Sequence, residues 1–218
     1  MRQFKLISLF LLCTLSVSAQ QENTDSMTIQ AAIDACIAMR DAVAANDTAA
    51  IRQSGKDLKA VGSVSFNSLR CKDDTPSSLN GHLVFDEAFA DSLAEGKDVY
   101  QKADVMSRSS AHRGQTADGS ILTKTCFVKA GKSTKYPFAS KGHQELAVVA
   151  EAGGLVTMKI HVTNNAGLNF HKDDTKNVKK GMPHRKTSFE LPNDKKNTVE
   201  LVVVNCGKKD CSFVVISN

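Results

Sequence analysis

The side chains best suited to binding lie together in one stretch of the sequence, from Thr163 to Lys186. The stretch is long, polar and rich in lysine, and long polar loops are where binding sites concentrate. A cationic surface attracts anions. The sequence therefore predicts a site for an anion, such as an acidic polysaccharide or a lipid A phosphate, formed by His171, Lys172, Lys179, Lys180, His184, Arg185 and Lys186. Two other interpretations stay open: a solvated loop, and a surface that docks against an acidic part of the chain.

The same stretch contains side chains that could ligate a metal ion. His171 and His184 lie on it, and Asp173 and Asp174 follow the first histidine. Their spacing matches no zinc or transition-metal motif, and no Asp-x-Asp-x-Asp-Gly pattern for calcium occurs. We therefore predict no metal site and no cofactor.

Cys206 and Cys211 enclose the short polar segment Gly207–Asp210, and runs rich in valine and isoleucine flank both cysteines. Such runs predict a β-hairpin, and cysteines at the two ends of its loop come within disulfide reach. A redox-active pair normally needs a helix N-terminus to lower a thiol pKa, and the sequence predicts none here. We therefore predict a structural disulfide between Cys206 and Cys211.

No pattern of residues points to catalysis. Cys36, Cys71 and Cys126 can form one further disulfide, whose pairing stays open. A nucleophilic Cys126 with His143 would lack any cysteine-hydrolase signature. The chain also contains no Gly-x-Ser-x-Gly, no His-Glu-x-x-His and no glycine-rich phosphate loop. We therefore predict no catalytic residues and no enzymatic activity.

Aromatic side chains are scarce, with no Trp and only two Tyr. A flat aromatic platform for sugars is hard to build from so few rings. Proteins that bind single-stranded nucleic acid also stack bases on aromatic rings, so nucleic acid is excluded as a partner.

Two kinds of element must position these side chains. Apolar residues recur at helical spacing from Met27 to Val61, and the break at Asn46–Thr48 predicts a helical hairpin. A third helix is predicted from Phe85 to about Met106. Beyond Ile121 the apolar residues alternate, which predicts strands at 125–129, 134–139, 145–150, 156–162, 187–191, 199–205 and 212–216.

This order of elements predicts the α+β class: an N-terminal helical hairpin and third helix, followed by an antiparallel, jelly-roll-like β-sandwich. The net charge also changes sign. Residues 20–112 carry 9 Lys and Arg against 14 Asp and Glu, whereas residues 113–218 carry 17 against 9. We predict a helical domain at 20–107, a linker at 108–120 and a β-sandwich domain at 121–218 that folds alone.

Residues 1–19 have the pattern of a cleaved signal peptide. Arg2 and Lys5 precede an apolar run, and the run closes on Val17-Ser18-Ala19. The run is shorter than the ~20 residues that span a bilayer. We therefore predict a secreted or periplasmic protein with no membrane span.

Three segments of the C-terminal half resemble the bacterial pre-peptidase C-terminal domain family, a small β-sandwich found after secreted peptidases. The segments are Val128–Phe138, Gln144–Gly154 and Phe213–Ser217. The resemblance implies a non-catalytic accessory module of an exported protein. No peptidase domain precedes the sandwich here, unlike in that family.

Taken together, these features favour a non-catalytic interaction or accessory module of the bacterial cell envelope, with an anionic envelope polymer or a protein as its partner. The alternative is a secreted hydrolase or enzyme inhibitor whose site lies between the helical and β halves.

Overall fold

The computed structural model describes residues 29–62, 64–65, 69, 78–103, 121–163, 169–173, 181–192 and 197–218. Within these ranges, the side chains of 64–65, 163 and 169–173 are not described. The predicted signal peptide and linker lie outside the described residues. No helix of the described part is long and apolar enough to cross a membrane.

The first two helices form the predicted hairpin. Residues 29–45 are helical and α2 spans Thr48–Ala60. The turn between them depends on Asn46, which adopts a left-handed φ of 56°, a conformation that asparagine tolerates better than most residues. Asp47 then caps α2, because its carboxylate accepts hydrogen bonds from the backbone N–H groups of Ala49 and Ala50.

The third helix is present but shorter than predicted. α3 spans Glu87–Ala94, with Asp86 as its N-cap, and a 3₁₀ turn, η1, follows at Tyr100–Lys102. Helix α3 ends because the chain turns at Gly96, whose φ of 74° only glycine adopts readily. Helices α2 and α3 approach closely at Gly55, where an added Cβ would lie 2.7 Å from the Cβ of Ala90.

The described residues form nine strands, numbered in chain order. They are β1 (Val64–Ser65), β2 (Leu122–Val128), β3 (Ser133–Ser140), β4 (Gly142–Ala150), β5 (Val156–Thr163), β6 (Asn169–Asp173), β7 (His184–Leu191), β8 (Asn197–Asn205) and β9 (Cys211–Ser217).

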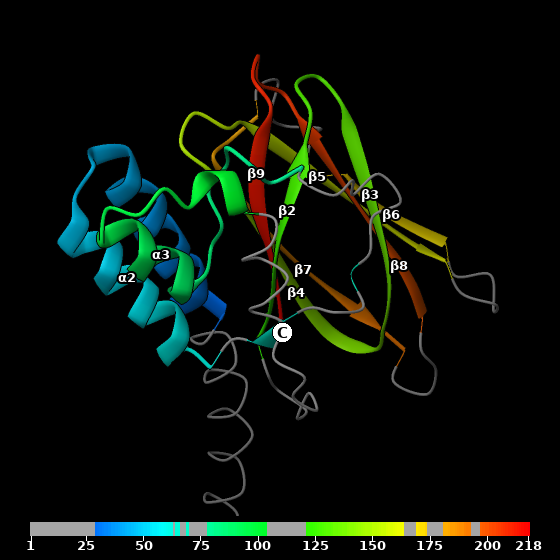
Figure 1. The fold of residues 1–218 in the computed structure, drawn as a ribbon. Coiled ribbons are helices and arrows are strands. Elements are labelled where there is room, and N and C mark those ends of the chain that lie inside the picture. The colour runs from blue at the N-terminus through cyan, green and yellow to red at the C-terminus, as the bar shows by residue number, and fades with distance from the viewer. Residues whose placement is uncertain are drawn as a thin grey trace, which may run out of the picture.

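The strands form two sheets, with orders β1-β2-β9-β4-β7 and β3-β8-β5-β6. The pairs are nested around the β5–β6 turn: β5 with β6, β4 with β7, β3 with β8 and β2 with β9 are all antiparallel neighbours. Strand β1 adds to the edge of β2 in parallel. This pattern is a jelly roll, so the predicted fold class is confirmed (Figure 1).

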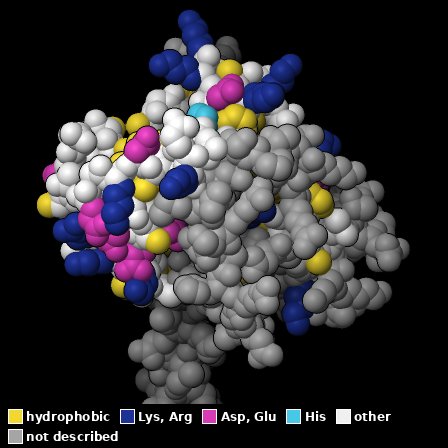
Figure 2. Space-filling model, in the orientation of Figure 1, with side chains coloured by type: hydrophobic (Ala, Val, Ile, Leu, Met, Phe, Trp, Pro, Cys, Tyr) yellow, Lys and Arg dark blue, Asp and Glu magenta, His cyan; other side chains and the backbone are white. Residues whose placement is uncertain are grey.

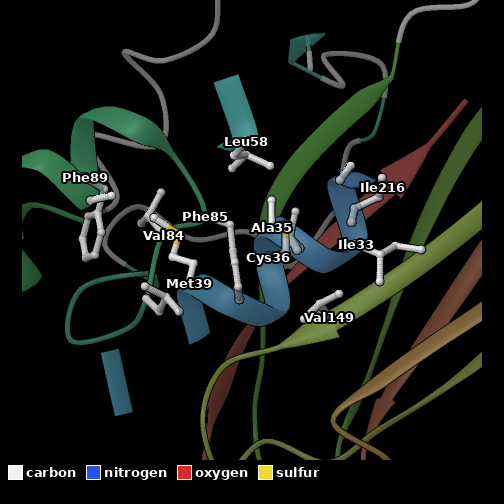
Figure 3. Close-up of a cluster of buried hydrophobic side chains, with 14 of the residues drawn as sticks. Ile33, Ala35, Cys36, Met39, Leu58, Val84, Phe85, Phe89, Val149 and Ile216 are labelled. Carbon is white, nitrogen blue, oxygen red and sulfur yellow. The ribbon is translucent and has the colours of Figure 1, made fainter. Parts of the chain in front are cut away.

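Apolar residues alternate along the strands and so form two hydrophobic clusters. One cluster fills the space between the sheets and includes Tyr136, Met158, Leu201 and Phe213. The other lies on the outer face of the five-stranded sheet, where the helices cover it. Figure 3 shows Ile33 of the first helix beside Val149 of β4 and Ile216 of β9.

The helical layer and the sandwich therefore share buried surface. Ala147, Val149, Val214 and Ile216 of the sheet belong to the same cluster as the helices. The N-terminal half also reaches the inner core, because Leu69 is fully buried there. The predicted domain boundaries stay a prediction, but this shared packing favours one cooperative unit over two that fold independently.

The predicted hairpin around Cys206 and Cys211 is wrong, and the predicted disulfide between them is not formed in this structure. Strand β8 pairs with β3 and β5, whereas β9 pairs with β2 and β4. The intervening residues cross from one sheet to the other, so they do not join neighbouring strands. Cys206 is exposed, with its Sγ 4.0 Å from Thr157 Oγ1 of β5, whereas Cys211 is buried in the inner core. Both are free thiols.

The stretch from Thr163 to Lys186 also differs from the predicted loop. It contains β6, which pairs along β5 from Thr163↔Asn169 to Lys159↔Asp173. This strand has no alternating apolar pattern in the sequence, because its residues, Asn-Phe-His-Lys-Asp, are mostly polar. It lies at the edge of its sheet, where a polar strand costs little.

We predict that the Ile216→Ala substitution lowers the free energy of unfolding by about 2–5 kcal/mol, because it leaves a cavity between the helices and the sheet. Urea titration followed by circular dichroism and by methyl NMR signals should show helices and strands unfolding together. The Val204→Ala substitution, at a half-buried position of β8 outside both clusters, is the control and should cost less. Loss of the helical signal well before the sandwich signals would contradict the single cooperative unit.

Candidate functional site

One end of the sandwich gathers four connections of the jelly roll. Because β2, β4 and β8 all end there, the residues 129–132, 151–155 and 206–210 meet at that end. Residues 181–183, which lead into β7, join them through the bridge between Met182 and Val156. This end lies at the top of Figure 1.

Hydrogen bonds hold the β2–β3 and β8–β9 connections together. The Asn205 N–H donates to the carbonyl of Lys132 at 2.9 Å, and the Asn205 side-chain amide donates to the carbonyls of Val128 and Lys209. In return, the carboxylate of Asp210 accepts a bond of 2.8 Å from the Ala130 N–H. Asn205 is fully buried, so these bonds position the two turns relative to each other.

Both turns present lysines to solvent. Lys129 and Lys132 of the first turn and Lys208 and Lys209 of the second are all exposed. We call these four residues the basic tip. Figure 2 shows Lys and Arg side chains gathered at this end of the molecule. The same two turns contain one carboxylate, Asp210, which accepts the bond from the Ala130 N–H, so the four lysines give these turns a net positive charge.

Sequence reasoning missed the basic tip. Its lysines occur as Lys-Ala-Gly-Lys and Lys-Lys-Asp in two turns almost eighty residues apart, and only the pairing of β2 with β9 brings them together. The available signal was that both lysine-bearing segments are turns, since lysines in turns face solvent.

The structure places the predicted binding residues in different surroundings. His184, Arg185 and Lys186 open β7. The Nζ of Lys186 lies 3.3 Å from the Glu145 carboxylate, and Nη1 of Arg185 lies 3.0 Å from Met182 Sδ. His171 and Lys172 belong to β6, an edge strand, and their side chains are not described. Lys179 and Lys180 lie outside the described residues.

These positions do not favour the interpretation in which the stretch from Thr163 to Lys186 docks against acidic helices. Lys186 pairs with Glu145 of the neighbouring strand β4 and not with a helical carboxylate. At the contact between the two halves the carboxylate lies on the sandwich and its basic partner lies on the helical half, which is the reverse of that expectation. A histidine of the helical half, His82, pairs with a carboxylate of the sandwich, Glu151.

Glu151 is the main polar contact between the helical half and the sandwich. Its Oε1 lies 2.6 Å from His82 Nδ1 and accepts a bond of 2.8 Å from the Ser212 N–H. Its Oε2 accepts a bond of 3.0 Å from the Leu83 N–H. The Ser212 hydroxyl donates to the Leu83 carbonyl at 2.7 Å and so completes the contact.

This arrangement favours a structural role for Glu151. Both carboxylate oxygens are hydrogen-bonded, and two of the three donors are backbone amides that cannot move a proton in a reaction. The neighbouring Cys211 is also unreactive, because burial raises its pKa to about 12, with smaller effects from the charges of Glu151 and Asp210. Among the described residues, no group of three or more His, Cys, Asp and Glu could hold a metal ion.

No protein-family model matches the chain, and no curated protein matches it significantly. The resemblance to the pre-peptidase C-terminal domain family therefore has no support from these comparisons, and what agrees with the sequence analysis is the sandwich architecture.

Solved structures resemble about half of this chain. The Yersinia pseudotuberculosis-derived mitogen is 8% identical, with a TM-score of 0.36, and the match covers 45% of this chain and 84% of the mitogen. Salmonella Typhimurium PliG, a periplasmic lysozyme inhibitor of g-type lysozyme, is 14% identical, with a TM-score of 0.28 and coverage of 45% and 89%. The CBM22-1 xylan-binding domain from Paenibacillus barcinonensis Xyn10C is 10% identical, with a TM-score of 0.27 and coverage of 49% and 86%.

We predict that His82 titrates above the ordinary value of 6.5. The hydrogen bond to Glu151 raises its pKa most, burial opposes the rise, and the charges of Glu151 and Asp210 add to it. A raised folded-state pKa means that folding favours the protonated imidazole. The stabilising contribution is therefore fully present below about pH 6.5 and is lost as the pH rises through the folded-state value.

An NMR titration of the His82 ring measures this pKa directly. The Glu151→Gln substitution should lower it, because the ring loses its anionic partner, and should remove the part of the stability that changes with pH. The Glu190→Gln substitution, which removes the partner of the exposed His143, is the matched control and should leave the His82 titration unchanged. An unchanged His82 pKa in the Glu151→Gln variant would contradict the assignment.

Proposed function

We propose that this protein is a non-catalytic interaction module that binds an anionic polymer through the basic tip. The observation that carries the proposal is the convergence of Lys129, Lys132, Lys208 and Lys209 on two turns that Asn205 and Asp210 hold together. Because the turns are already ordered, binding would not have to order their backbones, which is a cost that flexible loops incur.

The predicted basic stretch supports the same conclusion. His184 and Arg185 open β7 just after Met182, which forms a β-bridge with Val156 at the same end of the sandwich. Arg185 therefore adds a cationic side chain at this end. Lys186 points away from this surface, towards Glu145, and we no longer assign it a binding role.

The proposal includes export to the cell envelope, which rests on the signal-peptide pattern of residues 1–19. It also includes the absence of enzymatic activity. The alternative, a hydrolase or inhibitor with a site between the two halves, is less favoured because the carboxylate at that junction, Glu151, is occupied by structural hydrogen bonds.

We predict that the purified chain binds heparin, a model polyanion, and that the Lys208→Glu/Lys209→Glu variant binds it at least about tenfold more weakly. Each charge at contact contributes about 1 kcal/mol in water, so two reversals exceed the 1.4 kcal/mol that correspond to tenfold. Binding should also weaken steeply with added salt, because the Debye length falls from about 10 Å at 0.1 M to about 3 Å at 1 M. Isothermal titration calorimetry measures both effects.

The control is Lys56→Glu/Lys141→Glu, which changes the net charge equally. Lys56 is an exposed residue of α2 and Lys141 is exposed in the turn between β3 and β4, away from the basic tip. If this control weakens heparin binding as much as the tip variant does, binding follows net charge and the proposed site is wrong.

A further inference from the structure

The exposed apolar side chains of the described residues gather beside the basic tip. Two large hydrophobic side chains are exposed in this part of the chain, Leu155 at 37% and Met182 at 39%. They are far apart in the sequence, but their backbones lie at the same end of the sandwich, because Val156 and Met182 exchange hydrogen bonds of 2.9 and 3.0 Å. Cys206 is exposed next to them, and its N–H donates to the Leu155 carbonyl at 2.7 Å. We call Leu155 and Met182 the apolar pair.

The backbone around the apolar pair is tightly packed, so the exposure of the two side chains is built into the fold. A Cβ added to Gly181 would lie 2.8 Å from the backbone of Leu155 and 2.9 Å from the Cβ of Cys206. Only glycine allows the chain before Met182 to approach so closely. The two side chains are therefore held at the surface by short, ordered connections.

The apolar pair and the basic tip share the same connection. Cys206, which bonds to Leu155, follows Asn205, which bonds to the Lys132 carbonyl, and Lys208 and Lys209 come next. The guanidinium of Arg185 also lies beside Met182, with Nη1 3.0 Å from Sδ. Cationic side chains and the two exposed apolar side chains thus occur together at one end of the sandwich.

We propose that this end docks on an anionic lipid bilayer, with the lysines against headgroup phosphates and with Leu155 and Met182 inserted into the interface. This inference rests on the proposed function, the binding of anions by the basic tip. It goes further because a polysaccharide or another polyanion would contact the lysines alone. Binding to a membrane–water interface is also stabilised by apolar side chains that lie beside cations. Each lysine near an anionic membrane strengthens binding roughly fivefold at low salt.

The absence of Trp from the sequence allows a direct test of insertion. The Leu155→Trp variant has a single indole, whose emission should shift to shorter wavelength when vesicles of equal parts phosphatidylcholine and phosphatidylglycerol are added. Brominated acyl chains should quench it. Lys56→Trp, on the exposed face of α2, is the matched control and should show neither effect.

Vesicle co-sedimentation and heparin titration together separate this inference from the proposed function. The Leu155→Ser/Met182→Ser variant should bind the mixed vesicles roughly tenfold more weakly, since it loses apolar surface that would enter the interface, and should bind heparin unchanged. The Lys208→Glu/Lys209→Glu variant should lose binding to both. The parent protein and all variants are prepared with the same N-terminus, so differences in vesicle binding between them do not come from residues 1–19.

Each outcome decides one of the two claims. Heparin binding with no preference for anionic vesicles overturns the bilayer proposal and leaves a polymer as the partner. Full vesicle binding by the serine variant overturns it as well, because the apolar pair would have no part in docking. If the protein binds neither heparin nor anionic vesicles, the proposed function itself is overturned.

Discussion

Each of the strands β2 to β9 pairs with the strand that lies symmetrically across the β5–β6 connection, and this nesting governs where the connections between them lie. Antiparallel strands that fold back in this order place alternate connections at opposite ends of the molecule. The connections that follow β2, β4 and β8 therefore meet at one end. Surface chemistry at that end belongs to segments that are distant in the sequence.

The helical half depends on the same sheets. Strands β4 and β9 are apolar on both faces, since Val148 and Val215 face the inner core and Val149 and Val214 face the helices. A strand with two apolar faces needs cover on both sides. Helices 29–45, α2 and α3 supply the outer cover, and Glu151 fixes one edge of that cover by accepting bonds from His82 and Leu83.

The net charges of the two halves of the sequence do not predict which side chains join the halves in the structure. The helical half is acidic in sequence and the sandwich is basic, which favours docking by opposite charge. Among the described residues, the two halves meet through apolar side chains and through hydrogen bonds of Glu151, Ser212 and Thr125, and the charged group at this contact, Glu151, belongs to the sandwich. The lysines of the turns are thereby left at the surface, where a partner can reach them.

The sequence by itself determined the fold class, because periodicity distinguishes helices from strands without reference to distant residues. It predicted the helical hairpin, with its break at Asn46–Thr48, and seven of the strands at nearly their observed positions. It did not predict β6, because the five residues of this edge strand, Asn-Phe-His-Lys-Asp, are mostly polar and have no alternating apolar pattern.

Which strands pair was decided only by the tertiary structure. Valine-rich runs around Cys206 and Cys211 look like a hairpin locally, yet each run pairs in a different sheet, and the two thiols face different surroundings. The basic tip and the apolar pair arise in the same way. Lys129 and Lys208, or Leu155 and Met182, become neighbours through hydrogen bonds between strands. Those bonds depend on how the sheets close around a common core, and no local pattern of residues encodes that closure.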